Sequence, residues 1–220
     1  MKIPISQRLL ACCNFVCPGD RVADIGTDHA LLPVFLVKTG VCRLAIAVDV
    51  KPGPVAAAQK AVKAADLSDT IDVRLGDGLS PISPDEVEDI VIAGMGGETM
   101  VEILKAAPWV LSDRYRLILQ PMTRVEVLHR FLYQHGFEIE EEHLMEDSGH
   151  RYVYLTAHFA GDAPVDDPFF HWRGGFLPPE GRPFWRMNAD HLERRAKGIE
   201  KTEPKEAATL RTLAQKLRAL

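Results

Sequence analysis

Short apolar runs alternate with helix-length segments along roughly the first two thirds of the chain. The runs are almost continuously apolar, which is typical of strands buried on both faces of a sheet; they span residues 21–26, 44–49, 71–75, 89–93 and 116–120. The segments between them carry apolar residues at helical spacing, as in 55–65, 100–106 and 124–135. This alternation predicts an α/β fold in which a parallel sheet has helices on both faces.

The ends of this region depart from the alternation. Ser6 is a good cap for a short helix reaching about residue 16, and the Pro-Gly-Asp sequence at 18–20 ends it. Residues 137–145 and 151–159 read as two more strands, joined by a turn at 147–150. A hairpin that closes an otherwise parallel sheet is typical of one variant of the doubly wound fold.

The C-terminal part has a different organisation. Residues 161–183 are rich in Gly, Pro and Asp and are predicted to form a linker or long loop. Two helices are expected next, at 184–199 and 204–219. Leucines at coiled-coil spacing mark the second, and an apolar stripe marks the first; these are Leu210, Leu213, Leu217 and Leu220, and Leu192, Ala196 and Ile199. We therefore expect a sheet domain over residues 1–160, and a linker with an antiparallel helical hairpin over 161–220.

Composition fits an ordinary globular protein, but charge is unevenly spread. The 220 residues are 46% hydrophobic and 26% charged, which excludes a disordered or collagen-like chain. The net charge of −5 argues against a nucleic-acid binder. However, residues 171–220 hold 11 Lys and Arg against 6 Asp and Glu, whereas residues 1–170 hold 15 against 25. Because the C-terminal part is basic although the rest of the chain is acidic, it could still bind an anionic partner.

The cysteines and the N-terminus favour a reduced, cytoplasmic protein. Cys12, Cys13, Cys17 and Cys42 form no CxxC pair and lack a matching distal Cys or His pair, so we expect buried thiols and no metal site. No signal peptide is recognisable, and no run of about 18 apolar residues could span a membrane.

Small and acidic residues gather where the predicted strands end. Gly26 follows the first strand, Asp49 ends the second, Asp77 lies just after the third and Gly94 after the fourth. Each alone could be a turn residue, but the carboxyl ends of parallel strands meet at one edge, where ligands bind. The first turn lacks the G-x-G-x-x-G pattern that cradles a pyrophosphate. S-adenosylmethionine carries no pyrophosphate, and strand-end carboxylates could accept its ribose hydroxyls and meet its adenine edge.

Several of these motifs together resemble the bacterial TrmK family, which comprises S-adenosylmethionine-dependent tRNA (adenine-22, N1) methyltransferases. The resemblance covers about residues 6–160, and its main matches are 22–33, 74–79, 92–97 and 117–121. It implies a Rossmann-like class I methyltransferase sheet followed by a helical coiled coil. Three positions depart from the family's usual residues. Met122 stands where Asn is usual, Thr27 where Ser is common and Arg151 where Lys is common.

The resemblance implies methylation of N1 of adenine 22 in the D-arm region of tRNA. N1 has an in-plane lone pair, so it needs alignment more than a base. Asp28 is the implied catalytic carboxylate, beside the exocyclic amino group, and His29 would orient it or contact RNA. The implied cofactor residues are Arg8, Asp24, Gly26, Asp49, Gly76, Asp77, Gly78, Ala93, Gly94 and Met95. After the fourth strand, the chain lacks the Asn/Asp-Pro-Pro-aromatic motif typical of enzymes that methylate exocyclic amines.

The basic tail is the candidate for tRNA backbone binding, through Arg182, Arg186, Arg194 and Arg195. Trp172, Phe176 and Trp185 could stack on bases or pack the hairpin onto the body. Two other functions remain open: a methyltransferase acting on a small molecule or protein, and a non-catalytic binding module of the same fold. We expect a monomer or weak dimer.

Overall fold

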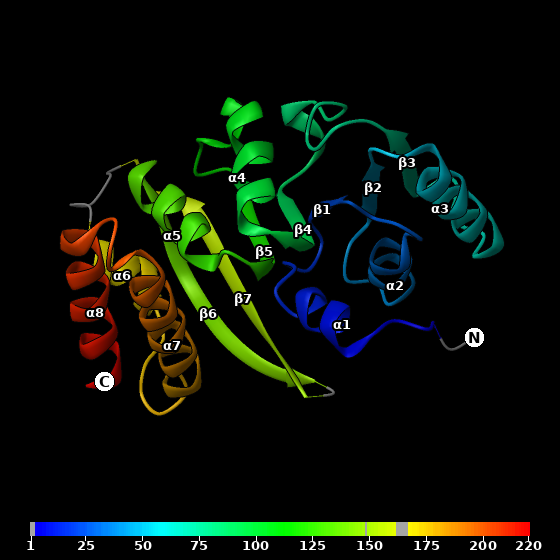
Figure 1. Ribbon diagram of the computed structural model, residues 1–220. Coiled ribbons are helices and arrows are strands. Elements are labelled where there is room, and N and C mark those ends of the chain that lie inside the picture. Colours follow the sequence, from blue (N-terminus) through cyan, green and yellow to red (C-terminus); the bar gives the residue numbers. More distant parts are fainter. Residues whose placement is uncertain (1–2, 148, 162–166) are drawn as a thin grey trace.

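A seven-stranded sheet forms the centre of the molecule (Figure 1). The computed structural model describes residues 3–147, 149–161 and 167–220. The strand order is β3-β2-β1-β4-β5-β7-β6, in which the first five are parallel and β7 runs antiparallel to both of its neighbours, β5 and β6. The strands are β1 (Arg21–Ile25), β2 (Leu44–Asp49), β3 (Ile71–Leu75), β4 (Asp89–Gly96), β5 (Arg116–Thr123), β6 (Phe137–Asp147) and β7 (His150–Phe159). The predicted α/β fold is confirmed.

Two helical layers cover the sheet because its central strands are apolar on both faces. Val22 and Val91 face one layer, while Ala23 and Ile90 face the other. The first layer holds α1 (Gln7–Cys13), α2 (Leu31–Lys38) and α3 (Pro52–Ala64); the second holds α4 (Gly97–Ala106) and α5 (Val125–Gln134). Single 3-10 turns, η1 (Pro84–Glu86) and η2 (Pro108–Val110), lie in the connections before β4 and β5. Ser6 caps α1 as expected, but the helix ends at Cys13 rather than near residue 16.

The β6–β7 hairpin is a long arm at the edge of the sheet. β6 and β7 pair from Phe137 opposite Phe159 to Asp147 opposite His150. Only the stretch of β7 from Leu155 to His158 also pairs with β5. The distal part of the arm therefore extends beyond the parallel sheet, as the two long strands in Figure 1 show. Ser148, in the expected turn, lies outside the described residues.

Three helices pack against this arm and α5. They are α6 (Pro168–Arg173), α7 (Arg182–Ile199) and α8 (Pro204–Arg218), and the last two lie side by side (Figure 1). The predicted linker is wrong over its middle, because Asp167 caps α6 there by accepting a hydrogen bond from the N–H of Phe169. Residues 162–166 of that linker lie outside the described residues.

An apolar cluster, separate from those on the two faces of the parallel strands, joins these helices to the body. Trp172, Phe176 and Trp185 are at most 6% exposed within it, together with Val153 of β7. The indole N–H of Trp185 donates to the carbonyl of Arg173, and Asn188 donates to that of Trp172, at 2.8 and 2.7 Å. These aromatic side chains pack the helices onto the body, so they are not available for stacking on bases.

The α7–α8 hairpin is antiparallel, as predicted, but its seam has a different register. The buried positions on α8 are Ala207, Leu210, Ala214 and Leu217. Leu213 is only partly buried and Leu220 is exposed. The spacing of three and four is the same in both sets, but Ala207 and Ala214 take two of the buried positions where leucines were expected. Within the described residues, no helix is both long and apolar enough to cross a membrane.

Candidate active site

A cavity of about 470 Å³ lies at the carboxyl ends of β1 to β4. Its size falls within the range of small-molecule sites, about 300–1,000 Å³. Eight of the ten predicted cofactor residues line it: Gly26, Asp49, Gly76, Asp77, Gly78, Ala93, Gly94 and Met95. Because these residues come from four different strand ends, the structure brings together what the sequence spreads over 70 positions.

Asp49 is the best anchored carboxylate of the cavity. It is 9% exposed at the end of β2, where Oδ1 accepts a hydrogen bond from the N–H of Lys51 at 3.0 Å. Oδ2 accepts a longer one from the N–H of Asp28 at 3.3 Å. An ionised carboxylate has about four acceptor sites, so each oxygen keeps capacity for one further donor. This geometry suits a pair of vicinal hydroxyls such as those of a ribose.

Asp28 belongs to a strained loop between β1 and α2. Asp28 and Ala30 both adopt left-handed backbone conformations, with φ of 53° and 52°. Such angles are uncommon outside glycine and cluster at functional sites. The Asp28 side chain is 69% exposed, and its Oδ1 lies 3.6 Å from Nε2 of His29. The loop therefore presents a solvent-accessible carboxylate whose backbone is tied to the cavity through Asp49.

Asp24 lies outside the cavity lining, in the interior behind the loop. It is 5% exposed, and Thr27 donates its hydroxyl to Oδ2 at 2.6 Å. Burial raises the pKa of Asp24 to about 6, and the charge of Asp49 adds to this, while the Thr27 hydrogen bond and Arg8 oppose it. Asp24 therefore stabilises the turn at Gly26 through its hydrogen bond with Thr27. Thr27, which replaces the family's common Ser, keeps the hydroxyl that does this.

Arg8 also lies beside the cavity and not in its lining. Its Nη1 donates to Oε1 of Gln120 at 2.6 Å, and the same oxygen accepts the N–H of Gly94 at 3.1 Å. A Cβ added to Gly94 would lie 3.1 Å from Arg8 Nη1, so the guanidinium rests directly over this glycine. Gln120 is fully buried and its Nε2 donates to the carbonyl of Pro121. Arg8 is therefore part of the support of the cavity floor.

One wall of the cavity was not predicted from the sequence. Thr99, Glu102, Ile103 and Ala106 of α4 line it, and so does Val50, which is 57% exposed after β2. The four α4 residues are spaced i, i+3, i+4 and i+7, which is one face of a helix. That spacing is visible in the sequence. However, the apolar residues Met100, Val101 and Leu104 are the more prominent pattern on this helix, and they indicate only the face that packs in the core.

Residues for the cofactor implied by the fold are present in this cavity. Two acceptor carboxylates, Asp49 and Asp77, stand beside an apolar wall that includes Val50 and Ile103. Gly26, Gly78 and Gly94 have φ of 77°, 54° and 81°, so backbone approaches the cavity without side chains. Adenine, ribose and a charged amino acid portion need this combination of apolar surface, acceptors and bare backbone.

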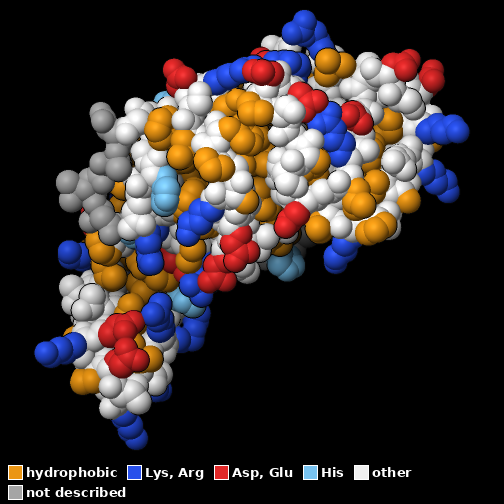
Figure 2. Space-filling view, turned by 90° about the horizontal axis from the view of Figure 1, so that it is seen from above, with side chains coloured by type: hydrophobic (Ala, Val, Ile, Leu, Met, Phe, Trp, Pro, Cys, Tyr) orange, Lys and Arg blue, Asp and Glu red, His pale blue; other side chains and the backbone are white. Residues whose placement is uncertain are grey.

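The predicted tRNA-binding arginines differ in their surroundings. Arg182 and Arg186 are exposed on α7 and line a hollow of about 400 Å³ together with Arg151 of β7. Arg195 instead pairs with Glu206 across the helical hairpin, at 2.9 Å. Arg194 is exposed, and no ion pair is found for it in the described part of the chain. Lys and Arg side chains project at the margins of the face in Figure 2, around a more apolar centre.

Comparisons with known proteins agree with this geometry. The model of the methyltransferase domain family matches residues 5–155. A tRNA (adenine(22)-N(1))-methyltransferase of Bacillus subtilis (strain 168) is 37% identical over 161 residues, which are 73% of this chain and 67% of that protein.

Solved structures extend the similarity to the C-terminal helices. The B. subtilis m1A22 tRNA methyltransferase TrmK superposes with a TM-score of 0.89 at 29% identity, covering 99% of this chain and all of that one. A Streptococcus pneumoniae protein described as a candidate tRNA (m1A22) methyltransferase, solved with S-adenosyl-L-methionine, gives a TM-score of 0.83 at 34% identity, covering 97% and 99% of the two chains. Sequence, fold and strand-end cavity therefore place this chain in the TrmK family of tRNA (adenine(22)-N(1))-methyltransferases.

Proposed function

We propose that this chain transfers a methyl group from S-adenosylmethionine to N1 of adenine 22 in tRNA, in the cytoplasm where tRNA is found. The observation that carries the proposal is the link from Asp28 to Asp49, because it joins an exposed carboxylate to the floor of a nucleoside-sized cavity. The proposed division of labour is a methyltransferase unit over residues 1–160 and a tRNA-binding unit over 161–220. Neither a small-molecule substrate nor a non-catalytic role accounts for both parts.

The cavity residues hold the cofactor in this proposal. S-adenosylmethionine supplies a methyl group on a sulfonium, which its acceptor attacks directly. Asp49 would accept the two ribose hydroxyls, and Asp77 with the neighbouring backbone would meet the adenine edge. Gly26, Gly94 and Met95 also line the cavity, and the methyl group would have to face the Asp28 loop for Asp28 to act on the substrate base.

Asp28 acts on the target base through its exocyclic amino group. The Watson–Crick edge of adenine carries both N1 and this amino group, so the base must leave its stack to enter. When N1 gains a methyl group, the purine becomes positively charged and the amino protons become more acidic. The Asp28 carboxylate accepts a hydrogen bond from the amino group and stabilises that charge. His29, beside it, orients the carboxylate or contacts the RNA backbone.

A methylation assay tests the function. Purified protein, unmodified tRNA and labelled S-adenosylmethionine should yield 1-methyladenosine, and nucleoside mapping should place it at position 22. A tRNA with guanine at position 22 should accept no label. Absence of transfer to any tRNA by the wild-type protein would overturn the proposal.

A pair of isosteric substitutions tests the role of Asp28. Asp28→Asn should lower the rate by about 10² or more while leaving cofactor affinity within about threefold. Asp66→Asn is a matched control, because Asp66 is also exposed with a left-handed φ of 59° but belongs to a turn after α3. Equal rates for the Asp28 variant and the wild type would remove the catalytic assignment and leave the function standing.

A further inference from the structure

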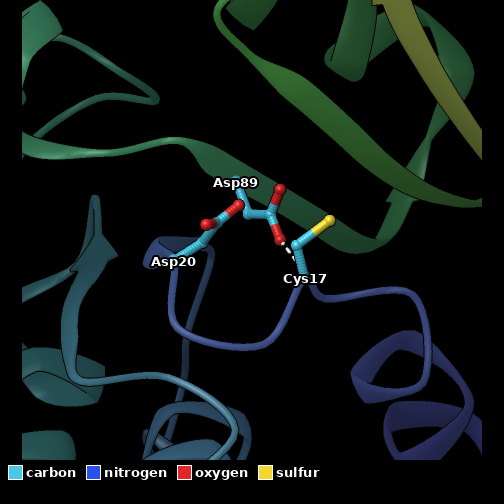
Figure 3. Close-up of side chains that lie close together, drawn as sticks. All are labelled: Cys17, Asp20 and Asp89. Carbon is cyan, nitrogen blue, oxygen red and sulfur yellow. Dashed lines mark hydrogen bonds between the residues drawn. The ribbon is translucent and has the colours of Figure 1, made fainter.

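A second cluster of polar side chains lies at the opposite edge of the sheet, where the parallel strands begin. Cys17 and Asp20 belong to the connection between α1 and β1, and Asp89 is the first residue of β4. One ligand atom from each of the three lies within 4.8 Å of the other two (Figure 3). The proposed methyl transfer does not use these residues, because its cavity is at the other ends of the strands.

Asp89 is the unusual member of the cluster. The residue is 0% exposed, and its Oδ2 accepts the N–H of Cys17 at 2.7 Å. Its Oδ1 is buried and has no hydrogen-bond partner among the described residues. A buried oxygen without a partner is energetically unfavourable, so it calls for a proton or a cation.

The charges around Asp89 leave a deficit of positive charge. Arg116 faces Asp89 in the strand register and donates from Nη1 to the sulfur of Cys17 at 3.2 Å. Arg116 also pairs through Nε with Glu140 at 3.3 Å, so its charge is shared. The carboxylates of Asp20 and Asp89 face this one cation, which Glu140 also shares. A divalent ion bound to them and to the Cys17 sulfur would supply the missing positive charge, with Arg116 as an outer hydrogen-bond donor to the sulfur.

The nearby acidic and basic groups already have partners. Glu88 forms a bidentate pair with Arg21, and His158 lies 3.3 Å from Glu140. A hollow of about 270 Å³, lined by the cluster together with Arg116 and His158, adjoins the site. It gives an ion a path from solvent and room for a water ligand.

We propose that Cys17, Asp20 and Asp89 bind a thiophilic divalent cation of the zinc class. The ligands are the sulfur of Cys17, one carboxylate oxygen of Asp20 and Oδ1 of Asp89, with water in the fourth position. A thiolate favours zinc over magnesium or calcium, and three protein ligands with water are common for zinc. The ion would join the α1–β1 connection to the start of β4.

The geometry needs a small closure. Metal–ligand distances of about 2.0–2.3 Å in a tetrahedral site place ligand atoms about 3.3–3.8 Å apart. The three side chains must therefore approach one another by up to about 1.5 Å. Cys17 and Asp20 lie in a connection without ladder pairing, so they can move toward Asp89, which the sheet holds.

Zinc titration of the full chain tests the site. The protein is treated with a chelator, dialysed and titrated with zinc chloride in a calorimeter. We expect one equivalent to bind and the thermal unfolding midpoint to rise by several degrees, because the ion binds only the folded arrangement. Cobalt(II) in place of zinc should give a sulfur-to-cobalt charge-transfer band. If zinc released no binding heat and did not shift the thermal unfolding midpoint, the proposal would be overturned.

Variants assign the ligands. Cys17→Ser should abolish the charge-transfer band although Cys12, Cys13 and Cys42 remain, and Asp89→Asn should weaken zinc binding at least about tenfold. Asp113→Asn, an exposed carboxylate lining the same hollow, should leave binding unchanged. Unchanged S-adenosylmethionine affinity in each variant shows that it is folded. Zinc binding that persists in both ligand variants would mean that the ion occupies other surface groups, and the site would be refuted.

Discussion

The guanidinium of Arg8 donates a 2.6 Å hydrogen bond to Oε1 of Gln120, which lies 112 positions later in the chain. Because the same oxygen accepts the N–H of Gly94, one buried amide fixes both α1 and the floor of the cavity. The Gln-Pro motif at the end of β5 thus acts on the cofactor site without lining it.

Replacing Gln120 by Ala should therefore weaken the cofactor site at a distance. The change leaves the Arg8 guanidinium and the Gly94 N–H without their acceptor, so we expect a loss of about 1–3 kcal/mol in stability. S-adenosylmethionine affinity should fall about tenfold, measured by calorimetry. Gln59→Ala, on the exposed face of α3, is the control and should change neither quantity. Unchanged S-adenosylmethionine affinity in the Gln120 variant would show that the cavity floor at Gly94 does not depend on the Gln120 hydrogen bonds.

Gly26 should not tolerate a side chain. Its φ is 77°, and an added Cβ would overlap Cε of Met95. Gly26→Ala should therefore lower stability and reduce cofactor affinity by more than tenfold, because the strained turn and Met95 both shift. Gly198→Ala is the control, since a Cβ in that α7 position meets nothing within 4 Å and should stabilise the helix by about 0.5–1 kcal/mol. Adding Met95→Ala to the first variant separates overlap from backbone strain.

His129 gives the fold a specific dependence on pH. The side chain is fully buried; Nε2 lies 2.7 Å from Glu142 Oε1 and Nδ1 lies 2.9 Å from the carbonyl of His171. Both partners accept, so both ring nitrogens donate and the ring is an imidazolium. Burial lowers the pKa of His129, but the Glu142 charge and the hydrogen bonds outweigh it, and the net direction is upward.

A raised pKa means that the folded state holds the proton more tightly than the unfolded chain. The stabilisation is therefore complete below the unfolded value of about 6.5 and is lost as pH rises through the folded value. Urea unfolding between pH 5 and 9 should show this loss in the wild type and a smaller one in His129→Gln. Asp24 and Asp89, with pKa values of about 6, add a loss of the same sign between about pH 4 and 6, common to both proteins. His143→Gln, whose ion pair is half exposed, should retain the wild-type profile.

Arg182 and Arg186 should contribute to tRNA affinity through charge alone. Replacing both by Gln should weaken binding about tenfold and reduce the slope of log K against log salt by about 1 to 2, because each phosphate contact releases counterions. Cofactor affinity should not change, since the cavity is lined by other residues. Arg211→Gln is the control, as Arg211 already pairs with Glu200 at 2.9 Å. Equal losses in both variants would point to general charge rather than this hollow.

The sheet could be predicted because its signal is local. Each parallel strand contains an apolar run, and small or acidic residues follow the first four of them. β2 and β3 were predicted with the bounds that the structure shows. α6 was missed because a six-residue helix within a Gly- and Pro-rich segment has no repeating apolar pattern. The α8 seam was assigned to the wrong leucine register because spacing alone does not show which side of a helix its neighbours cover.

The candidate site was predictable to the extent that it lies at strand ends. The α4 wall of the cavity is a helix face whose polar and apolar residues do not stand out in the sequence. The Cys17–Asp89 contact joins residues 72 positions apart, so the spacing of the cysteines could not indicate it. The expectation of no metal site rested on that spacing and now faces a specific test.

The packing of α7 and α8 on the hairpin arm limits how the chain can be divided. Leu144 and Val153 of the arm and Val125 of α5 are covered by the C-terminal helices. A protein truncated after residue 160 would expose these three apolar side chains. Glu142 would also lose the hydrogen bond that its carboxylate accepts from the N–H of Gly175. Such a fragment should self-associate, because it would have an exposed apolar patch beside an edge strand. The segment that looks like an accessory in the sequence also serves as the outer wall of the methyltransferase half, so its contribution to RNA binding must be measured by point substitutions rather than by deletion.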